Sequence, residues 1–354
     1  MTASLPEIER LLESAVARSG SAVIGVAGVE GGEVAWSSAV GGGASASFQA
    51  GSLAKTVTAA VVLELVHRGV LDLDADVNTR LSSWTLPSGS GASLRQLLSH
   101  TAGVNVPFCP GYPQDGPVPT LTQSLQGVEP ATTPPVTVNP KVAGRFRYSG
   151  GGYAVIQQVI EDVTKQPFAE VARQVVFEPL AMGQSSFAQP PEPLPTPAWA
   201  EWRMYPEQSA AGLWTTPRDL ARFVCAVQTA LQGAGAGLAP ETAAGMTTPH
   251  AKLPWRGQWT LLKLLGLNSP GHAGLGLFIR DDRFINFGGA AGSSSALTGS
   301  TDGTGAVVMT AGCRSPLAVR LLLEISDARG WTDLRAFPRG ARRGASGVAL
   351  RALS

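Results

Sequence analysis

The sequence predicts an α/β protein built on an antiparallel sheet, with helices on both faces of the sheet and a mainly helical lobe inserted in the chain. Strand-like stretches separated by turn residues gather near the two ends of the chain. The middle of the chain instead holds helical patterns and long proline-rich connections. A chain of 354 residues with 44% hydrophobic residues can bury a sizeable core, so we expect one catalytic unit of two lobes.

The two ends of the chain are expected to supply the sheet and the helices that cover it. Residues 1–19 have the pattern of an amphipathic helix, and the turn Glu30-Gly31-Gly32 joins two strands into a hairpin. The expected strands are residues 21–29, 33–38, 275–279, 283–287, 293–298 and 306–310, and the expected helices that follow the insertion are residues 219–232 and 316–329. Consecutive strands with short turns indicate antiparallel pairing.

The inserted part is expected to begin with a helix that starts at Ser52, runs to His67 and ends at Gly69. Shorter helices are expected at 94–99 and 154–164, and the expected proline-rich loops are residues 105–140 and 189–197. The predicted organisation is an α/β lobe from residues 1–50 and 205–337, a mainly helical lobe from residues 51–204, and a C-terminal tail from residues 338–354.

Composition excludes several classes of partner. The formal net charge is +1, so nothing favours nucleic acid or an anionic membrane as a partner. Cys109, Cys225 and Cys313 are widely spaced, and an odd count without a CxxC pair argues against a disulfide framework or a zinc site. The histidines also lack metal-ligand spacing. We therefore expect no metal and no cofactor, and the oligomeric state is left open.

The N-terminus does not have the profile of an export signal. It carries Glu7, Glu9, Arg10 and Glu13 and lacks a basic segment followed by an apolar one. No apolar run reaches the roughly 18 residues of a membrane-spanning helix. The expected location is the cytoplasm.

Residues 48–56 carry the first catalytic signal, in the sequence FQAGSLAKT. Ser52 and Lys55 are almost one helical turn apart, so their side chains fall on one face of the helix. Serine is a poor nucleophile unless a neighbouring group takes its proton, and a neutral lysine amine can do so. The spacing therefore can build a nucleophile with its own base, although S-x-x-K also arises by chance as a helix cap beside a solvated lysine.

A second constellation places Tyr148 and Ser149 in a glycine-flanked turn before a helix. Three more segments accompany it in order: LLSHTAG at residues 97–103, EPLAM at 178–182 and AGLWTTPRDLA at 211–221. Together these motifs resemble the serine β-lactamase-like superfamily over roughly residues 20 to 325. That group includes class C β-lactamases, penicillin-binding proteins, D-amino-acid peptidases, carboxylesterases and acyltransferases. The resemblance implies the β-lactamase/transpeptidase-like fold.

The resemblance assigns roles to particular residues. Ser52 is the expected nucleophile, and Lys55 and Tyr148 are the expected proton-transfer pair, with the choice of working base left open. The backbone N–H groups of Ser52 and Ala290 are the expected oxyanion donors. His100 is expected to be structural. The expected substrate-binding residues are Gly150, Phe287, Gly288, Gly289 and Trp214, and the other tryptophans that could line an acyl pocket or equally pack in the core are Trp199, Trp202 and Trp255.

Two positions depart from the motifs of this superfamily. Phe287 stands where the resemblance expects Lys or His, and Gly150 replaces an asparagine that orients the lysine and binds an acyl amide. The loss of that asparagine is expected to leave room and to remove two hydrogen-bonding groups. Both changes disfavour substrates with a carboxylate near the scissile bond.

The sequence therefore predicts a serine acyl-enzyme catalyst. It is expected to cleave a carboxylic ester or amide of a small-molecule donor and pass the acyl group to water, an amine or an alcohol. A carboxylesterase or a transacylase, placed in a biosynthetic pathway, is the leading interpretation. The alternatives are a β-lactamase or D-amino-acid peptidase, and, in another class, an inactive binding or regulatory protein on the same fold.

Overall fold

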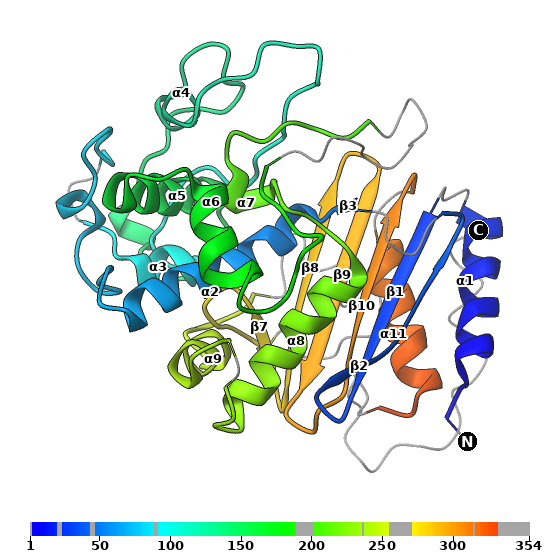
Figure 1. Cartoon of the computed structure of the whole chain (residues 1–354). Helices are drawn as coiled ribbons and strands as arrows, with labels where there is room; N and C mark the ends of the chain where they lie inside the picture. Colours follow the sequence, from blue (N-terminus) through cyan, green and yellow to red (C-terminus); the bar gives the residue numbers. More distant parts are fainter. Residues whose placement is uncertain are drawn as a thin grey trace.

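The computed structural model describes residues 2–19, 23–42, 47–87, 91–188, 201–235, 237–254, 271–313 and 316–331. Within these residues eight strands form one sheet in the order β2-β1-β10-β9-β8-β7-β6-β5 (Figure 1). Every neighbouring pair is antiparallel. The predicted fold class, an antiparallel sheet flanked by helices with a mainly helical lobe, is confirmed.

The strands of the sheet are β1 (Val23–Glu30), β2 (Glu33–Val40), β5 (Ala251–Lys252), β6 (His272–Ala273), β7 (Phe278–Arg280), β8 (Arg283–Ala290), β9 (Ser293–Ser300) and β10 (Gly305–Ala311). A separate two-stranded ribbon pairs β3 (Phe48–Gln49) with β4 (Trp214–Thr215). The α-helices are α1 (Leu5–Ser19), α2 (Ala54–His67), α3 (Leu94–Leu98), α4 (Leu121–Gln126), α5 (Gly150–Thr164), α6 (Phe168–Ala172), α7 (Gln208–Ala211), α8 (Pro217–Leu231), α9 (Pro240–Thr247) and α11 (Leu317–Ala328).

Helices cover both faces of the sheet (Figure 1). On one face α1 and α11 bury apolar side chains such as Leu12 and Leu322 against Val26 and Val308. On the other face α8 and the helical lobe form a second and larger apolar cluster, which includes Phe223. The chain thus has a layered architecture in which the sheet separates two apolar cores.

The helical lobe surrounds α2, which lies beside the sheet in Figure 1. From Ala54 to Leu65 every residue of α2 is buried. A helix that is buried on all sides must be enclosed by other elements, and α5, α7 and α9 contact it here. A short 3-10 turn, Gly51–Leu53, precedes α2 and carries Ser52. The predicted helix from Ser52 to His67 is confirmed, with this tighter first turn.

The structure corrects three expectations about the elements. The expected loop 105–140 contains α4, whose start carries a reciprocal cap between Thr120 and Gln123. Helix α5 begins at Gly150, four residues before the expected start at Ala154. The expected strand 275–279 is replaced by the shorter β7, and β5 and β6 were not predicted.

The predicted boundaries between the lobes stay a prediction. Within the described residues, the strands of the large sheet come from both ends of the chain and the helices around α2 from its middle (Figure 1). The expected tail, residues 338–354, and the expected loop 189–197 lie outside the described residues. In the part of the chain that is described, no helix is long and apolar enough to cross a membrane.

Candidate active site

Ser52 lies where the 3-10 turn before α2 meets strand β8. Gly51 has a φ of +54°, and a Cβ at this position would lie 2.6 Å from the carbonyl oxygen of Gly289. Only glycine tolerates both this backbone conformation and this contact. The turn therefore packs directly against the strand, and the half-buried Ser52 lies at this junction.

Ser52, Lys55 and Tyr148 meet in one hydrogen-bonded cluster. The Lys55 Nζ donates to Ser52 Oγ at 3.2 Å, and the Tyr148 hydroxyl donates to the same oxygen at 2.8 Å. The sequence places Ser52 and Lys55 on one helix face, whereas Tyr148 comes from the turn before α5. The structure brings together the three residues that the sequence predicts to carry the chemistry.

Lys55 is held in a fixed position. Its side chain is only 4% exposed, and Nζ donates a 2.6 Å hydrogen bond to the carbonyl oxygen of Ala210 in α7. The ammonium group also lies over the rings of Tyr148 and Tyr153, at 5.1 and 5.6 Å from their centroids. A carbonyl dipole and two aromatic faces thus replace the water that a buried cation loses.

Tyr148 is positioned by the start of α5 and by His100. Ser149 caps the helix, because its Oγ accepts the N–H of Gly152 at 2.9 Å and donates to the carbonyl of Val106. The backbone N–H of Ser149 donates to His100 Nδ1 at 3.1 Å, and the His100 ring lies against the Tyr148 ring with centroids 4.5 Å apart. The phenol is therefore supported from behind while its hydroxyl faces Ser52.

The contacts of His100 agree with the structural role that the sequence predicts for it. Burial, and next the charge of Lys55, lower the pKa of His100 to about 3. The neutral ring can accept the Ser149 N–H, which a protonated imidazolium could not do. The residue has a φ of +58°, so the backbone of this turn must be held in a conformation that few side chains adopt.

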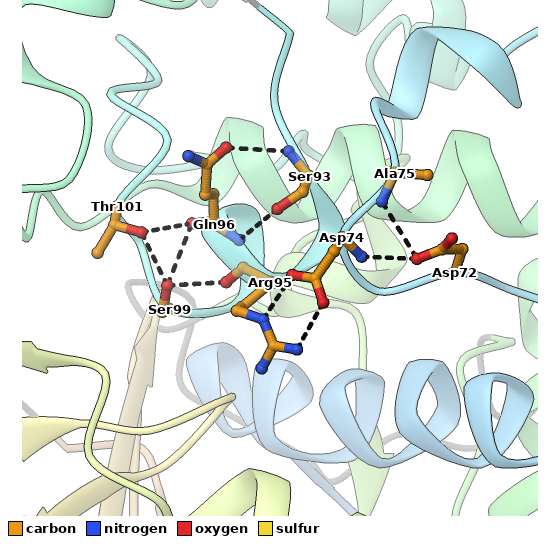
Figure 2. A network of polar contacts seen from close by, with 8 residues as sticks. All are labelled: Asp72, Asp74, Ala75, Ser93, Arg95, Gln96, Ser99 and Thr101. Carbon is orange, nitrogen blue, oxygen red and sulfur yellow. Dashed lines mark hydrogen bonds and ion pairs between the residues drawn. The ribbon is translucent and has the colours of Figure 1, made fainter.

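A polar network around α3 stabilises that turn (Figure 2). Arg95 forms a two-pronged ion pair with Asp74, at 2.6 and 2.7 Å. The hydroxyl of Ser99 donates to the Arg95 carbonyl and contacts the Thr101 hydroxyl at 2.9 Å. These bonds fix both sides of His100, so the LLSHTAG segment acts as a support for Tyr148.

The expectation that Gly150 leaves room in the site is wrong. The N–H of Gly150 donates to the carbonyl of Pro107 at 2.8 Å, and this hydrogen bond holds the segment around Pro107 against the start of α5. A Cβ on Gly150 would lie 3.0 Å from the Cys109 Sγ and 3.2 Å from its backbone nitrogen. The segment Pro107–Cys109 therefore fills the space that an asparagine side chain would need. Burial raises the pKa of the Cys109 thiol, which remains a neutral group.

Strand β8 forms the opposite side of the site. A Cβ on Gly288 would lie 2.2 Å from the Ala50 carbonyl oxygen and 2.8 Å from the Ser52 nitrogen, so glycine is required there. Ala290 is paired with Ser293 across a two-residue turn, which directs its N–H at β9. The alternation of the ladder then directs the N–H and C=O of Gly289 to the free edge, beside Gly51. This geometry favours Gly289 over the predicted Ala290 as a second oxyanion donor.

Phe287 and its neighbour Asn286 are directed to opposite faces of β8. Phe287 is half-buried and packs on Phe278 with ring centroids 5.7 Å apart. Asn286 is buried, and its side-chain amide donates to Thr56 Oγ1 at 2.6 Å and to the Gly276 carbonyl at 3.0 Å. Asn286 thus ties β8 to α2. This role is not predicted from the sequence, where the only signal is an asparagine within a strand pattern, a residue that strands usually lack.

Trp214 presents little surface to a ligand. It is 5% exposed, and its ring meets Trp202 edge to face at 5.4 Å. Its assignment to the substrate site stays a prediction. Trp199 and Trp255 lie outside the described residues. Among the residues that the structure describes, no group of three His, Cys, Asp or Glu side chains could hold a metal ion.

Comparison with known proteins agrees with this geometry. The model of the Beta-lactamase family matches residues 8–324. The chain belongs to the β-lactamase family. The superfamily that the sequence motifs indicated is thereby confirmed.

Similar proteins bear several different names. Penicillin-binding protein 4 of Amycolatopsis lactamdurans is 31% identical over 142 residues, which cover 39% of this chain and 35% of that protein. The curated relatives are matched over about a third of their length. The structure of an octameric penicillin-binding protein homologue from Pyrococcus abyssi has a TM-score of 0.74 at 18% identity, covering 93% of this chain and 78% of that one. A D-stereospecific amidohydrolase from a Streptomyces species has a TM-score of 0.66 at 23% identity, covering 90% and 98%. At these identities the structures show a shared fold.

Proposed function

We propose that the protein is a serine acyl-enzyme catalyst that cleaves a neutral carboxylic ester or amide and transfers the acyl group to water, an alcohol or an amine. One observation carries the proposal: Ser52 Oγ lies within hydrogen-bonding distance of both the Lys55 amine and the Tyr148 hydroxyl. A serine hydroxyl flanked by two proton-transfer groups is the arrangement that covalent acyl catalysis requires.

The chemistry proceeds in two half-reactions. With one proton removed from the Lys55–Tyr148 pair, that pair takes the proton of Ser52 as Oγ attacks the acyl carbon. The tetrahedral intermediate collapses when the bond to the alcohol or amine breaks and the pair returns the proton to the leaving oxygen or nitrogen. In the second half-reaction water or an acceptor enters at the vacated position, and the same groups act in reverse order.

The negative oxygen of the tetrahedral intermediate needs aimed donors. The N–H of Ser52 is one, since it heads the turn that β8 contacts. The N–H of Gly289 at the free edge of β8 is the second that the strand register supports. Preorganised backbone donors of this kind contribute on the order of 10²–10³-fold each to the rate.

Neutral substrates follow from what lies around this cluster. Phe287 offers no cation to a carboxylate, and the Pro107–Cys109 segment replaces the amide group of an asparagine at Gly150. Apolar surroundings also disfavour water relative to a bound alcohol or amine, which supports transfer beside hydrolysis. The relative named as a D-stereospecific amidohydrolase favours a second candidate, cleavage of a small amide, which the same nucleophile would perform.

Intact-protein mass spectrometry tests the proposal. Incubation with neutral short-chain nitrophenyl esters should add one acyl mass to the wild type and none to Ser52→Ala, whose turnover should fall by about 10⁴-fold or more. Ser14→Ala, an exposed serine of α1, is the matched control and should acylate normally. Turnover by Ser52→Ala at the wild-type rate would refute the mechanism. If no ester or amide acylates the wild type, the alternative that the protein is an inactive binding protein would be supported instead.

Product partitioning then separates the two fates of the acyl group. With one ester held constant and the acceptor varied, we expect amide or transferred ester to form alongside free acid. If only free acid forms across a broad panel of amines and alcohols, the protein is a hydrolase and the transfer reaction is excluded.

A further inference from the structure

Phe108 is an exposed aromatic side chain beside the proposed catalytic cluster. Its side chain is 57% exposed, the largest value among the large hydrophobic residues that are exposed in the described part of the chain. Its ring lies 5.7 Å from the ring of Tyr148, centroid to centroid. An exposed apolar residue is ordinary on a protein surface, so its position next to the reacting hydroxyl is what makes it informative.

The segment that carries Phe108 is held rigidly. The carbonyls of Val106 and Pro107 accept the N–H groups of Gly151 and Gly150, which are unsatisfied first-turn donors of α5. Both glycines are required: a Cβ on Gly151 would lie 2.9 Å from the Val106 Cβ, and one on Gly150 would meet the Cys109 thiol at 3.0 Å. Phe108 therefore stands on a fixed platform at the site, as a specificity residue should.

The Lys55 amine and the Tyr148 hydroxyl differ in how accessible they are to a substrate. This difference indicates which part of a substrate would contact Phe108. Lys55 is 4% exposed and already bonded to Ala210, whereas Tyr148 is half-buried and lies beside the exposed ring of Phe108. A bulky leaving group can approach the Tyr148 hydroxyl but not the enclosed amine. The departing alcohol or amine, and any acceptor that later takes its place, therefore lies next to Phe108.

We propose that Phe108 is a specificity-determining residue for the alcohol or amine portion of the substrate and favours an aryl or alkyl group there. The inference rests on the proposed function and adds the chemical class of the leaving group and acceptor. The proposal assigns the acyl portion to the side of β8 and the leaving group to the side of Phe108. The ring recognises its ligand by apolar contact and offset stacking.

Esters that share one acyl group test this directly. We compare acylation kcat/KM for benzyl acetate and methyl acetate in the wild type, Phe108→Ala and Phe108→Trp, with Val118→Ala as an exposed apolar control from the same segment of chain. The benzyl-to-methyl ratio should fall about fivefold in Phe108→Ala, the size of one lost aromatic contact, and should be restored in Phe108→Trp. Deacylation by water should be unchanged, since the acyl-enzyme no longer holds the alcohol.

Three outcomes would overturn the inference: an unchanged ratio in Phe108→Ala, an equal change in Val118→Ala, or a change that follows the acyl chain at constant alcohol instead. Binding of benzyl alcohol to the Ser52→Ala protein, followed by NMR, separates this inference from the proposed function. Binding that Phe108→Ala weakens, in a protein whose wild type no ester acylates, would keep the subsite and refute the acyl-enzyme. Acylation of the wild type with a benzyl-to-methyl ratio that Phe108→Ala does not change would support the acyl-enzyme and refute the subsite.

Discussion

The two sides of the site are built differently. On the helical side, Ser52, Lys55 and Tyr148 are hydrogen-bonded to one another, and His100 supports them from below. On the strand side, β8 presents Gly288 and Gly289 with little side-chain chemistry of its own. The helical side thus holds the proposed proton-transfer groups, whereas the strand side holds the proposed backbone donors.

This difference determines how freely the side chains on each side can vary. A proton relay tolerates few changes, because each group depends on the geometry of the next. A strand edge that uses only backbone atoms leaves its neighbouring side chains free to vary, and Phe287 occupies such a position. The chain accordingly keeps the motif residues on the helical side and departs from the motif on the strand side and at Gly150.

The largest effect should come from breaking the helical side. Lys55→Met and Tyr148→Phe should each lower acylation kcat/KM by about 10²-fold or more, since each removes one proton-transfer group. Because the two act as a unit, the double variant should be little worse than the worse single variant. Stopped-flow acylation with one nitrophenyl ester measures all three.

Unfolding curves serve as the control for these variants, because Lys55 is buried and its replacement can weaken packing. Methionine keeps most of the volume of the lysine stem. Losses that simply multiply in the double variant would contradict a coupled pair.

The strand side is tested by one matched pair of glycines. Gly288→Ala should lower kcat by about 10²-fold, because its Cβ would press on Ala50 and displace the Ser52 N–H from the oxyanion position. Gly289→Ala adds a Cβ whose nearest neighbour is 3.8 Å away, so its loss should stay within about tenfold. Steady-state kinetics with one ester compares them. Equal losses would show that the close approach at Gly288 is not what matters.

Acid pH should weaken the support beneath Tyr148. The pKa of His100 is about 3 when folded and near 6.5 when unfolded, so the unfolded state binds the extra proton first as the pH falls. The stabilisation is complete above pH 6.5 and is lost towards pH 3, by about 2 kcal/mol at pH 5. His250, whose pKa burial also lowers, adds to this loss, while Glu207, whose pKa burial raises, opposes it.

His100→Asn isolates that contribution. Asparagine tolerates a positive φ, and its carbonyl can accept the Ser149 N–H without titrating. Urea unfolding at pH 7.5 and pH 5 should show a smaller difference for His100→Asn than for the wild type, with His250→Asn as the comparison. An identical pH dependence in wild type and His100→Asn would mean that the ring is not buried neutral.

The smallest effect is expected at Phe287. The wild type should turn over benzylpenicillin poorly and should not prefer a carboxylated substrate over its methyl ester. Phe287→Lys should shift that preference towards the carboxylate by up to about tenfold, because a partly exposed ion pair contributes little. Phe287→Leu is the uncharged control. Efficient hydrolysis of benzylpenicillin by the wild type would contradict the role given to Phe287.

Long periodic elements could be predicted from the sequence, and short ones could not. Helices α2, α8 and α11 and the β1–β2 hairpin follow from repeated apolar spacing. Strands β5 and β6 have two residues each, too few to show alternation. The first turn of α5 was missed because Gly150, Gly151 and Gly152 are poor helix formers. The helix nevertheless begins there because each of the three glycine N–H groups has an acceptor. These acceptors are the carbonyls of Pro107 and Val106 and the hydroxyl of Ser149.

The site divides in the same way. The spacing of Ser52 and Lys55 is local, so the sequence alone indicates it, and Tyr148 was found through the resemblance of its motif. Whether Gly289 or Ala290 directs its N–H at the site depends on strand register, which a one-residue shift reverses. That Cys109 fills the space beside Gly150 depends on a loop contact that no periodicity encodes.

The order of strands also bears on how this chain becomes active. Strand β1 lies between β2 and β10, with Val23 opposite Ala311, so its second partner strand is available only after residues 31–304 have been synthesised. Closing so long a loop is slow, and the contact order of this sheet is correspondingly high. Ser52 leaves the ribosome long before Gly288 and Gly289, which complete its oxyanion site. A nascent chain therefore carries the proposed nucleophile without the strand that would stabilise a reaction, and activity should appear only after the sheet has closed.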